Sequence, residues 1–234
     1  MTETSIDRRH FFGTGVAAVA GAALIAPTAA RAQAASGWQP AADPKDAWMD
    51  MPGTLHRMAF DCTAAGAAGA GLGFANNFIE TSRTGYGTPA SQIGTIIIYR
   101  HDATPFAYNN AMWVKYGRQF AKMLKLESDE AIAAISGNPL FAKPAGPSSL
   151  PPSWAWMDDM YISTIVKNNV HFAVCGLATE GIAMQLAGKT GDAKAIQAEL
   201  GANLIPNGHL MPSGIVAVNR AQEHGYAFAY VSGA

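Results

Sequence analysis

The chain has 234 residues, 49% of them hydrophobic, and its 16 basic and 17 acidic side chains leave a net charge of −1. Because it has no basic patch and no arginine run, we expect no nucleic-acid partner. No basic amphipathic stretch favours binding to a membrane surface. Its two cysteines could form one disulfide, but they are too few for a disulfide scaffold.

The N-terminus resembles an export signal. Arg8 and Arg9 precede two phenylalanines and a small-residue apolar run over 13–26, and Ala30-Arg31-Ala32 fits a cleavage site. The modest hydrophobicity of the run favours the twin-arginine pathway over the ordinary secretory route. The run is too short to span a membrane. We therefore predict a twin-arginine signal peptide over 1–32 and a mature protein exported to the periplasm, with no membrane attachment after cleavage.

The rest of the chain is long enough for one domain with a sizeable core. Residues 33–53 are rich in Ala, Pro, Asp and Gly and are predicted to be an N-terminal arm or linker. A single α/β domain is predicted over 54–234, with a proline-rich insertion near 136–156. The loop 136–161 is either a lid or binding loop, or an inert insertion held by its tryptophans.

Two strand–helix units are predicted in the first half of the domain. His56–Cys62 is typical of a strand, and Thr63 can cap a helix that runs to about Ser82. The apolar, β-branched run Gly94–Arg100 indicates a buried strand. Thr104-Pro105 then opens a helix that ends near Lys125.

The second half continues the alternation of helices and strands. Helices are predicted over 158–167, Ala178–Ala187 and Asp192–Leu200, and strands over Val170–Cys175, Ala202–Pro206 and Tyr226–Val231. Strands that alternate with helices indicate an α/β fold with a mostly parallel sheet, here of about five strands.

Cys175 is the principal candidate for chemistry. It ends an apolar strand and directly precedes a helix, which is where open α/β folds place their sites. The positive end of a helix favours the thiolate, the nucleophilic form of cysteine. The alternative is a buried, inert cysteine, since free cysteine is among the most buried residue types.

Three further residues are expected at the same edge of the sheet. Asp61 and His101 both precede predicted helices, and His101 could act as a base or stabilise a thiolate, or simply lie in a solvated loop. Cys62 also ends a strand. If its strand neighbours that of Cys175, the two Cα atoms would be about 4.8 Å apart, within disulfide range, whereas an intervening strand would separate them by about 10 Å.

No resident metal or cofactor is expected. His171 and Cys175 share a strand face but lie about 13 Å apart, too far to share an ion. His209 and Met211 in a predicted loop, with Met49 and Met51 in the arm, could bind copper(I), although metal sites usually show a tighter cluster. The sequence has no P-loop, no dinucleotide fingerprint and no paired zinc motif.

The C-terminal third resembles the DsrE/DsrF-like family of small sulfur-handling proteins. The residues that carry the resemblance are Val170–Cys175 with Gly181, the run Pro212-Ser213-Gly214-Ile215-Val216-Ala217-Val218, and Gln222-Glu223-His224-Gly225-Tyr226 with the aromatic residue Phe228. The leader, the arm and the proline-rich loop depart from the compact cytoplasmic members. The resemblance implies a three-layer α/β/α sandwich, often a homo-oligomer, and a persulfide carried by the cysteine that matches Cys175.

The leading hypothesis is therefore an exported DsrE-like protein that handles sulfur or thiols, with Cys175 as persulfide acceptor or relay. Its activity would be that of a sulfur carrier or sulfurtransferase, and its partner a sulfur donor or acceptor protein or a small sulfur compound. Cys62 is a candidate resolving thiol and His101 a candidate base. The alternative is a non-enzymatic ligand-binding or assembly module of the same fold that uses the 136–161 loop.

Overall fold

The computed structural model describes residues 39–126, 136–143 and 160–233. By its contacts the chain divides into Met1–Gln39 and Pro40–Ala234, and the second unit contains every described helix and strand. The predicted signal peptide therefore lies outside the described residues. Within the described residues, no helix combines the length and the apolar character needed to cross a membrane.

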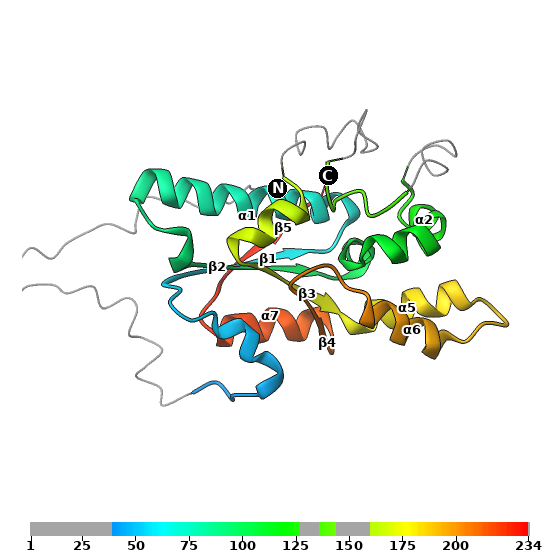
Figure 1. The fold of residues 1–234 in the computed structure, drawn as a ribbon. Coiled ribbons are helices and arrows are strands. Elements are labelled where there is room, and N and C mark those ends of the chain that lie inside the picture. The colour runs from blue at the N-terminus through cyan, green and yellow to red at the C-terminus, as the bar shows by residue number, and fades with distance from the viewer. Residues whose placement is uncertain (1–38, 127–135, 144–159, 234) are drawn as a thin grey trace, which may run out of the picture. The chain divides into compact units, whose positions relative to one another are not determined.

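A five-stranded parallel sheet forms the centre of the molecule (Figure 1). Its strands are β1 (His56–Cys62), β2 (Ile93–Tyr99), β3 (Val170–Cys175), β4 (Gly208–Met211) and β5 (Ala227–Val231). They lie in the order β4-β3-β2-β1-β5, and every neighbouring pair is parallel. The predicted α/β fold with a mostly parallel sheet of about five strands is confirmed, as is the sandwich of three layers.

Helices cover both faces of the sheet. The described helices are α1 (Ala65–Tyr86), α2 (Asn110–Met123), α4 (Ile162–Ile165), α5 (Gly176–Ala187), α6 (Ala193–Ala202) and α7 (Gly214–Glu223), with 3-10 turns η2 (Pro44–Asp50), η3 (Ala90–Gln92), η4 (His101–Ala107) and η6 (Val166–Asn168). In Figure 1, α1 and α4 lie above the sheet, whereas α7 and η2 lie below it. Helices α5 and α6 pack against each other beyond the carboxyl end of β3.

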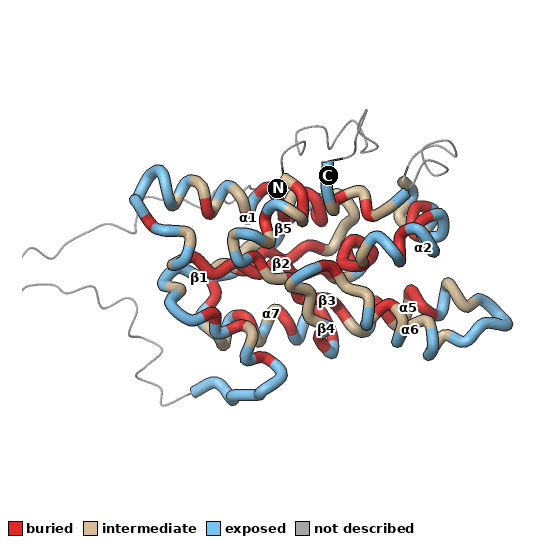
Figure 2. The backbone as a smooth tube through the Cα atoms, in the orientation of Figure 1, coloured by how far each residue is buried: buried red, intermediate tan, exposed pale blue. Residues whose placement is uncertain are grey.

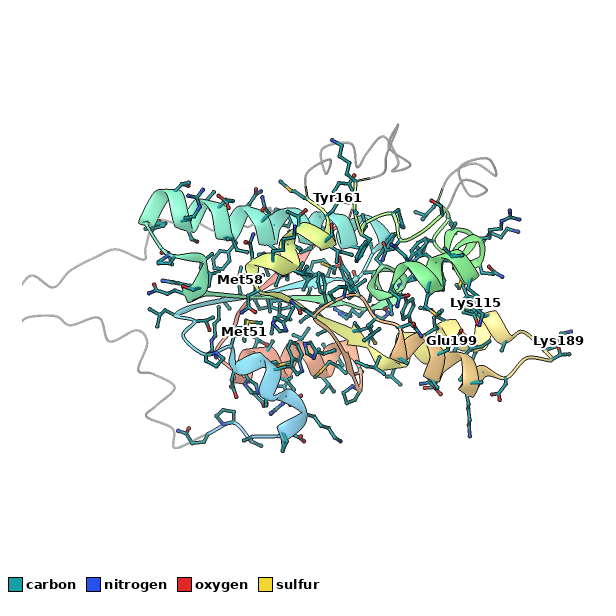
Figure 3. The ribbon with its side chains drawn as sticks, in the orientation of Figure 1. Met51, Met58, Lys115, Tyr161, Lys189 and Glu199 are labelled. Atoms are coloured by element: carbon teal, nitrogen blue, oxygen red, sulfur yellow. The ribbon has the colours of Figure 1, made fainter. Side chains whose placement is uncertain are left out.

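Each face of the sheet carries its own apolar core. Leu72 of α1, Ile97 of β2 and Phe172 of β3 belong to the larger core, and Figure 3 shows Tyr161 on this side. Met51 lies on the opposite side, in the smaller core between the sheet and α7. Every residue of β2 is buried, as its unbroken apolar run predicts for a strand covered on both faces (Figure 2).

The prediction of a strand over Ala202–Pro206 was wrong. Helix α6 continues to Ala202, and β4 begins only at Gly208. The apolar pair that suggested a strand is used elsewhere: Ile205 donates its N–H to the carbonyl of Ala107 at 2.9 Å, and Leu204 forms an isolated antiparallel bridge with Tyr108. These bonds anchor the approach to β4 against η4 and satisfy the buried backbone groups outside the sheet.

The helix predicted from Thr104 to Lys125 is divided. Residues His101–Ala107 form η4, and α2 begins at Asn110, where the side chain of Asn109 caps it by accepting the N–H of Met112 at 3.2 Å. Asparagine is a stronger N-cap signal than the Thr-Pro pair that guided the prediction. Lys115 of α2 pairs with Glu199 of α6 at 2.5 Å and ties the two helices together (Figure 3).

From Pro40 onward the predicted arm belongs to the body of the domain. Met49 of η2 is fully buried, and its carbonyl accepts a hydrogen bond from Tyr226 Oη at 2.7 Å. Arg220 of α7 pairs with the buried carboxylate of Asp46. A fully buried side chain and an ion pair fix η2 against the domain, so residues 40–53 are not a free linker.

The insertion predicted at 136–156 is described only over 136–143. Its start is fixed in the core, because the Asn138 amide donates to the carbonyls of Phe106 and Tyr108, both at 2.8 Å. Leu140 is fully buried. The remainder of the loop proposed as a lid, 144–159, lies outside the described residues. The helix predicted over 158–167 is represented by α4 and the 3-10 turn η6.

Candidate functional site

Cys175 ends β3 and is the N-cap residue of α5. Its Sγ accepts the backbone N–H of Ala178 at 3.3 Å, and the residue is 6% exposed. The free N–H groups at a helix N-terminus carry partial positive charge and favour anions. The structure therefore places the thiol at the junction of strand and helix that the sequence indicated.

A buried chain of hydroxyl groups holds this junction in place. Thr179 of α5 donates its Oγ1 hydrogen to the carbonyl of Cys175 at 2.9 Å, and Tyr108 donates its hydroxyl to Thr179 at 3.0 Å. Burial, as the largest cause, raises the pKa of Tyr108, so this donor keeps its proton. Both side chains are fully buried. Thr179 and Tyr108 thus fix the backbone of Cys175, and its thiol is held at the start of α5.

Gly176 allows β4 to approach the thiol. A Cβ atom at this position would lie 2.6 Å from the carbonyl oxygen of Met211 and 3.0 Å from that of Pro212. No other residue type fits at that distance without a shift of the backbone. A glycine at position 176 therefore allows the end of β4 to pack against the start of α5.

An arginine at the end of the neighbouring strand supplies a positive charge at the same edge of the sheet. Arg100 directly follows β2, and its Nε and Nη2 both donate to the carboxylate of Asp61 at 2.7 Å. The hydrogen bonding to Asp61 is the main cause of the raised pKa of Arg100; burial opposes the rise, and electrostatic attraction to the Asp61 carboxylate adds to it. The side chain of Arg100 is 20% exposed, and that of Asp61 is 2% exposed. Arg100 is thus a positive group that a buried carboxylate holds in place at this edge of the sheet.

Helix α7 closes against the same arginine. A Cβ atom on Gly214, the first residue of α7, would lie 2.5 Å from Cβ of Arg100. Ser213 caps α7 by accepting the N–H of Val216 at 3.3 Å. The starts of α5 and α7 and the arginine therefore gather at one edge of the sheet, and all three favour negative charge there.

His101 reaches the arginine and not the thiol. It is exposed, adopts a left-handed conformation with φ of 51°, and its Nε2 lies 3.0 Å from Arg100 Nη1. Asp61 is fully used by Arg100 and is not free to act as a base. His101 therefore contacts Arg100 and is not in hydrogen-bond contact with Cys175. The sequence had suggested that it could act on the thiol directly.

Cys62 is a structural residue, and it cannot pair with Cys175 directly. Strand β2 lies between β1 and β3, so the arrangement with an intervening strand is the one found, with the two Cα atoms about 10 Å apart. Both cysteines are free thiols. Cys62 is fully buried beneath Gly71 of α1, and burial, followed by the charge of Asp61, raises the pKa of its thiol. A disulfide would need backbone movement, and a protonated buried thiol is a poor nucleophile.

A second group of ring side chains lies on the α7 side of the sheet. His171 of β3 and His209 of β4 are hydrogen-bonded through Nδ1 and Nε2 at 3.0 Å. The sequence placed His209 and Met211 in a loop, but both lie on β4. In the described residues, no group of three or more His, Cys, Asp or Glu side chains is arranged to hold a metal.

Comparison of the chain with protein-family models, with curated proteins and with solved structures found no match.

Sequence reasoning missed Arg100, Thr179 and Gly176. A signal for Arg100 was available, because Asp61 stands in an otherwise apolar strand and a buried carboxylate needs a cationic partner. The nearest candidate was an arginine at the same end of the next strand. The roles of Thr179 and Gly176 depend on the packing of α5 against η4 and β4, which no local pattern reveals.

Proposed function

We propose that the chain is an exported sulfur-handling protein of the DsrE-like type, in which Cys175 accepts and passes on sulfane sulfur. The Cys175 thiolate attacks the terminal sulfur of a persulfide or polysulfide donor. A new S–S bond forms at Cys175, the S–S bond of the donor breaks, and the donor leaves as a thiolate. Attack by an acceptor thiolate on the outer sulfur of the Cys175 persulfide restores the free thiolate. No external oxidant or reductant is consumed.

The observation that carries this proposal is the position of Cys175 Sγ at the start of α5, 3.3 Å from the backbone nitrogen of Ala178, with Arg100 at the same end of the neighbouring strand β2. Sulfur transfer needs an anionic sulfur before the reaction and again after it, since a persulfide is itself anionic at neutral pH. A helix N-terminus and a fixed guanidinium stabilise both forms. Cys62, which lacks these neighbours and is fully buried, serves no such step.

The surroundings of the thiol suit a partner protein as donor or acceptor. Leu177, which follows Cys175 by two residues, and Ile215, in the first turn of α7, are both 63% exposed. Gly176 and Pro212 are in close approach, so these two apolar side chains come from adjacent helix starts. Exposed apolar side chains around a reactive group are typical of a surface that another protein covers. A small polysulfide would need no such surface.

The test is the mass of the protein after exposure to inorganic polysulfide. The reduced mature chain is treated with polysulfide, desalted and measured as the intact protein and after proteolysis. We expect a gain of one sulfur atom at Cys175, removed by a small thiol reductant and recovered as thiocyanate with cyanide. Cys175→Ser is expected to gain none, and the unchanged Cys62 in that variant is the internal control.

Two outcomes would contradict the proposal. Sulfur uptake that persists in Cys175→Ser would assign the reactive group elsewhere. A folded wild-type protein that gains no sulfur would favour the alternative, a non-enzymatic ligand-binding or assembly module of the same fold.

A further inference from the structure

A histidine pair on the face of the sheet opposite α1 forms a second site, separate from Cys175. Ala173 lies beside His209 in the register of β3 and β4, and His171 shares a strand face with Ala173, so the two imidazoles project to the same side. Their rings are within 13° of coplanar with centroids 5.3 Å apart, and Nδ1 of His171 faces Nε2 of His209 at 3.0 Å. The two nitrogens thus point at each other along one line.

The hydrogen-bond network assigns the protons of this pair. Asn169 Oδ1 lies 3.2 Å from His171 Nε2 and can only accept, so His171 carries its proton on Nε2. His171 Nδ1 therefore holds a lone pair and accepts the proton of His209 Nε2. Burial lowers the pKa of His171, and burial followed by the charge of His171 lowers the pKa of His209 to about 4. Imidazole binds metals through a ring nitrogen that carries a lone pair, as His171 Nδ1 does in this arrangement.

Trp48 of η2 covers the pair. Its ring stacks on His209 with centroids 3.9 Å apart and 2° between the planes, and it lies 5.8 Å from His171. These distances place the midpoint between the two histidines about 4.2 Å from the centroid of Trp48, inside the roughly 6 Å range of a cation–π interaction. An aromatic ring face at this distance favours a positive charge between the imidazoles.

A cavity reaches one member of the pair, His209, and the ring of Trp48 that covers it. A cavity of about 690 Å³ is lined by Trp48, His209 and Met211 together with residues of the arm and of α7. Met211 lies two residues beyond His209 on the same strand face and is 3% exposed, within the apolar cluster that also contains Met49. The pair thus has imidazole nitrogens, an aromatic face above it, buried thioethers nearby and a route for entry.

We propose that His171 and His209 bind a soft monovalent cation of the Cu(I) or Ag(I) class between His171 Nδ1 and His209 Nε2, beneath Trp48. Binding requires the proton of His209 to move from Nε2 to Nδ1, so no net proton is released. Metal–nitrogen bonds of about 2 Å require the in-line nitrogens to separate by about 1 Å. A d¹⁰ monovalent ion accepts two ligands in line, whereas Zn²⁺ takes four, and among the described residues no group of three or more His, Cys, Asp or Glu side chains could hold a metal ion.

The test measures Cu(I) and Ag(I) binding in a Cys175→Ser background, because the thiol would compete for the same ions. The protein is titrated with Cu(I) under anaerobic conditions against the chelator bicinchoninate. We expect one equivalent per chain, with affinity about 100-fold or more lower in His171→Gln and in His209→Gln, because each variant removes one of the two nitrogens that bind the ion. His56→Gln is the matched control, since His56 is an exposed histidine at the start of β1, and it should leave the affinity unchanged.

Trp48 supplies a readout that does not depend on the histidine variants folding well. In the Cys175→Ser protein with both histidines intact, Ag(I) should quench Trp48 fluorescence, and Trp48→Leu should remove that change. The same variant should keep one equivalent and lose about fivefold in affinity, as the removal of a cation–π contact predicts. Binding that survives both histidine substitutions overturns the proposal, as does a folded chain that takes up neither ion.

Discussion

The contact between α1 and Cys62 can be tested with one added methyl group. Gly71 lies within α1, and a Cβ atom there would meet Cys62 Sγ at 2.5 Å and Cγ2 of Ile97 at 3.4 Å. Both neighbours are fully buried, so neither can move into solvent. We expect Gly71→Ala to force α1 away from the sheet, at a cost of about 1–3 kcal/mol for overpacking.

The same helix contains its own control. Gly85 is also in α1, but a Cβ atom there has nothing within 4 Å. Gly85→Ala should therefore stabilise the protein by about 0.5–1 kcal/mol through helix propensity alone. Gly71→Ala gains the same propensity, so the difference between the two variants isolates the contact, at about 1–3 kcal/mol.

The assay is equilibrium unfolding in urea, supported by thermal melting. For a domain of this size the expected difference corresponds to roughly 2–4 °C in melting temperature per kcal/mol. Adding Cys62→Ala to Gly71→Ala removes the sulfur and should recover most of the loss, with a coupling of about 1–2 kcal/mol. If Gly71→Ala is as stable as Gly85→Ala, or if the double variant shows no coupling, the packing described for Cys62 is wrong.

Three further predictions concern the thiols, the buried ion pair and export. At neutral pH, iodoacetamide should alkylate Cys175 in the native protein and spare Cys62. The raised pKa and the burial of Cys62 leave it reactive only after unfolding, so its alkylation rate should be lower by about 1,000-fold or more. Equal labelling of the two cysteines by mass spectrometry would contradict this. Asp61→Asn should cost about 3 kcal/mol in urea unfolding, because it leaves a largely buried guanidinium without its carboxylate; a loss below about 1 kcal/mol would contradict the pairing. Replacing Arg8 and Arg9 with lysines should leave precursor in the cytoplasm, whereas normal processing would indicate the ordinary secretory route.

The sheet could be predicted from the sequence because its central strands are marked by composition. The run over 94–100 is apolar and β-branched, and it appears in the structure as β2 displaced by one residue. The strand ending at Cys175 was predicted with the bounds that β3 has. Strand β4 was missed because it contains His209 and is only four residues long, whereas the apolar pair Leu204-Ile205 nearby is the stronger local signal.

The candidate site was predictable in part. A cysteine between a strand and a helix indicates a thiol at the carboxyl edge of the sheet, and Cys175 lies there. However, the strand order reverses between β1 and β5, so Cys175 is not at the switch point where ligands of open α/β folds usually bind. The order of the strands also determines whether Cys62 can pair with Cys175, because β2 separates their two strands. The residues next to each cysteine in the sequence do not reveal that order.

The register of β4 determines both sites at once. Cys175 pairs with Met211 and Ala173 with His209, so a slip of one residue would turn His209 to the other face and withdraw the Met211 carbonyl from Gly176. The turn before the strand fixes this register: Asn207 has φ of 57° and donates its amide to the carbonyl of Val170 at 3.1 Å.

Gly208, the first residue of β4, is the position at which this register can be disturbed. A Cβ atom there would lie 2.8 Å from the backbone oxygen of Ile205, whereas one at Gly201 would meet only a terminal methyl of Leu210 at 3.2 Å. Gly208→Ala should therefore change the alkylation rate of Cys175 and weaken Ag(I) binding together, while Gly201→Ala changes neither. If Gly208→Ala alters one readout and leaves the other at its wild-type value, the two sites do not share β4 as their common support.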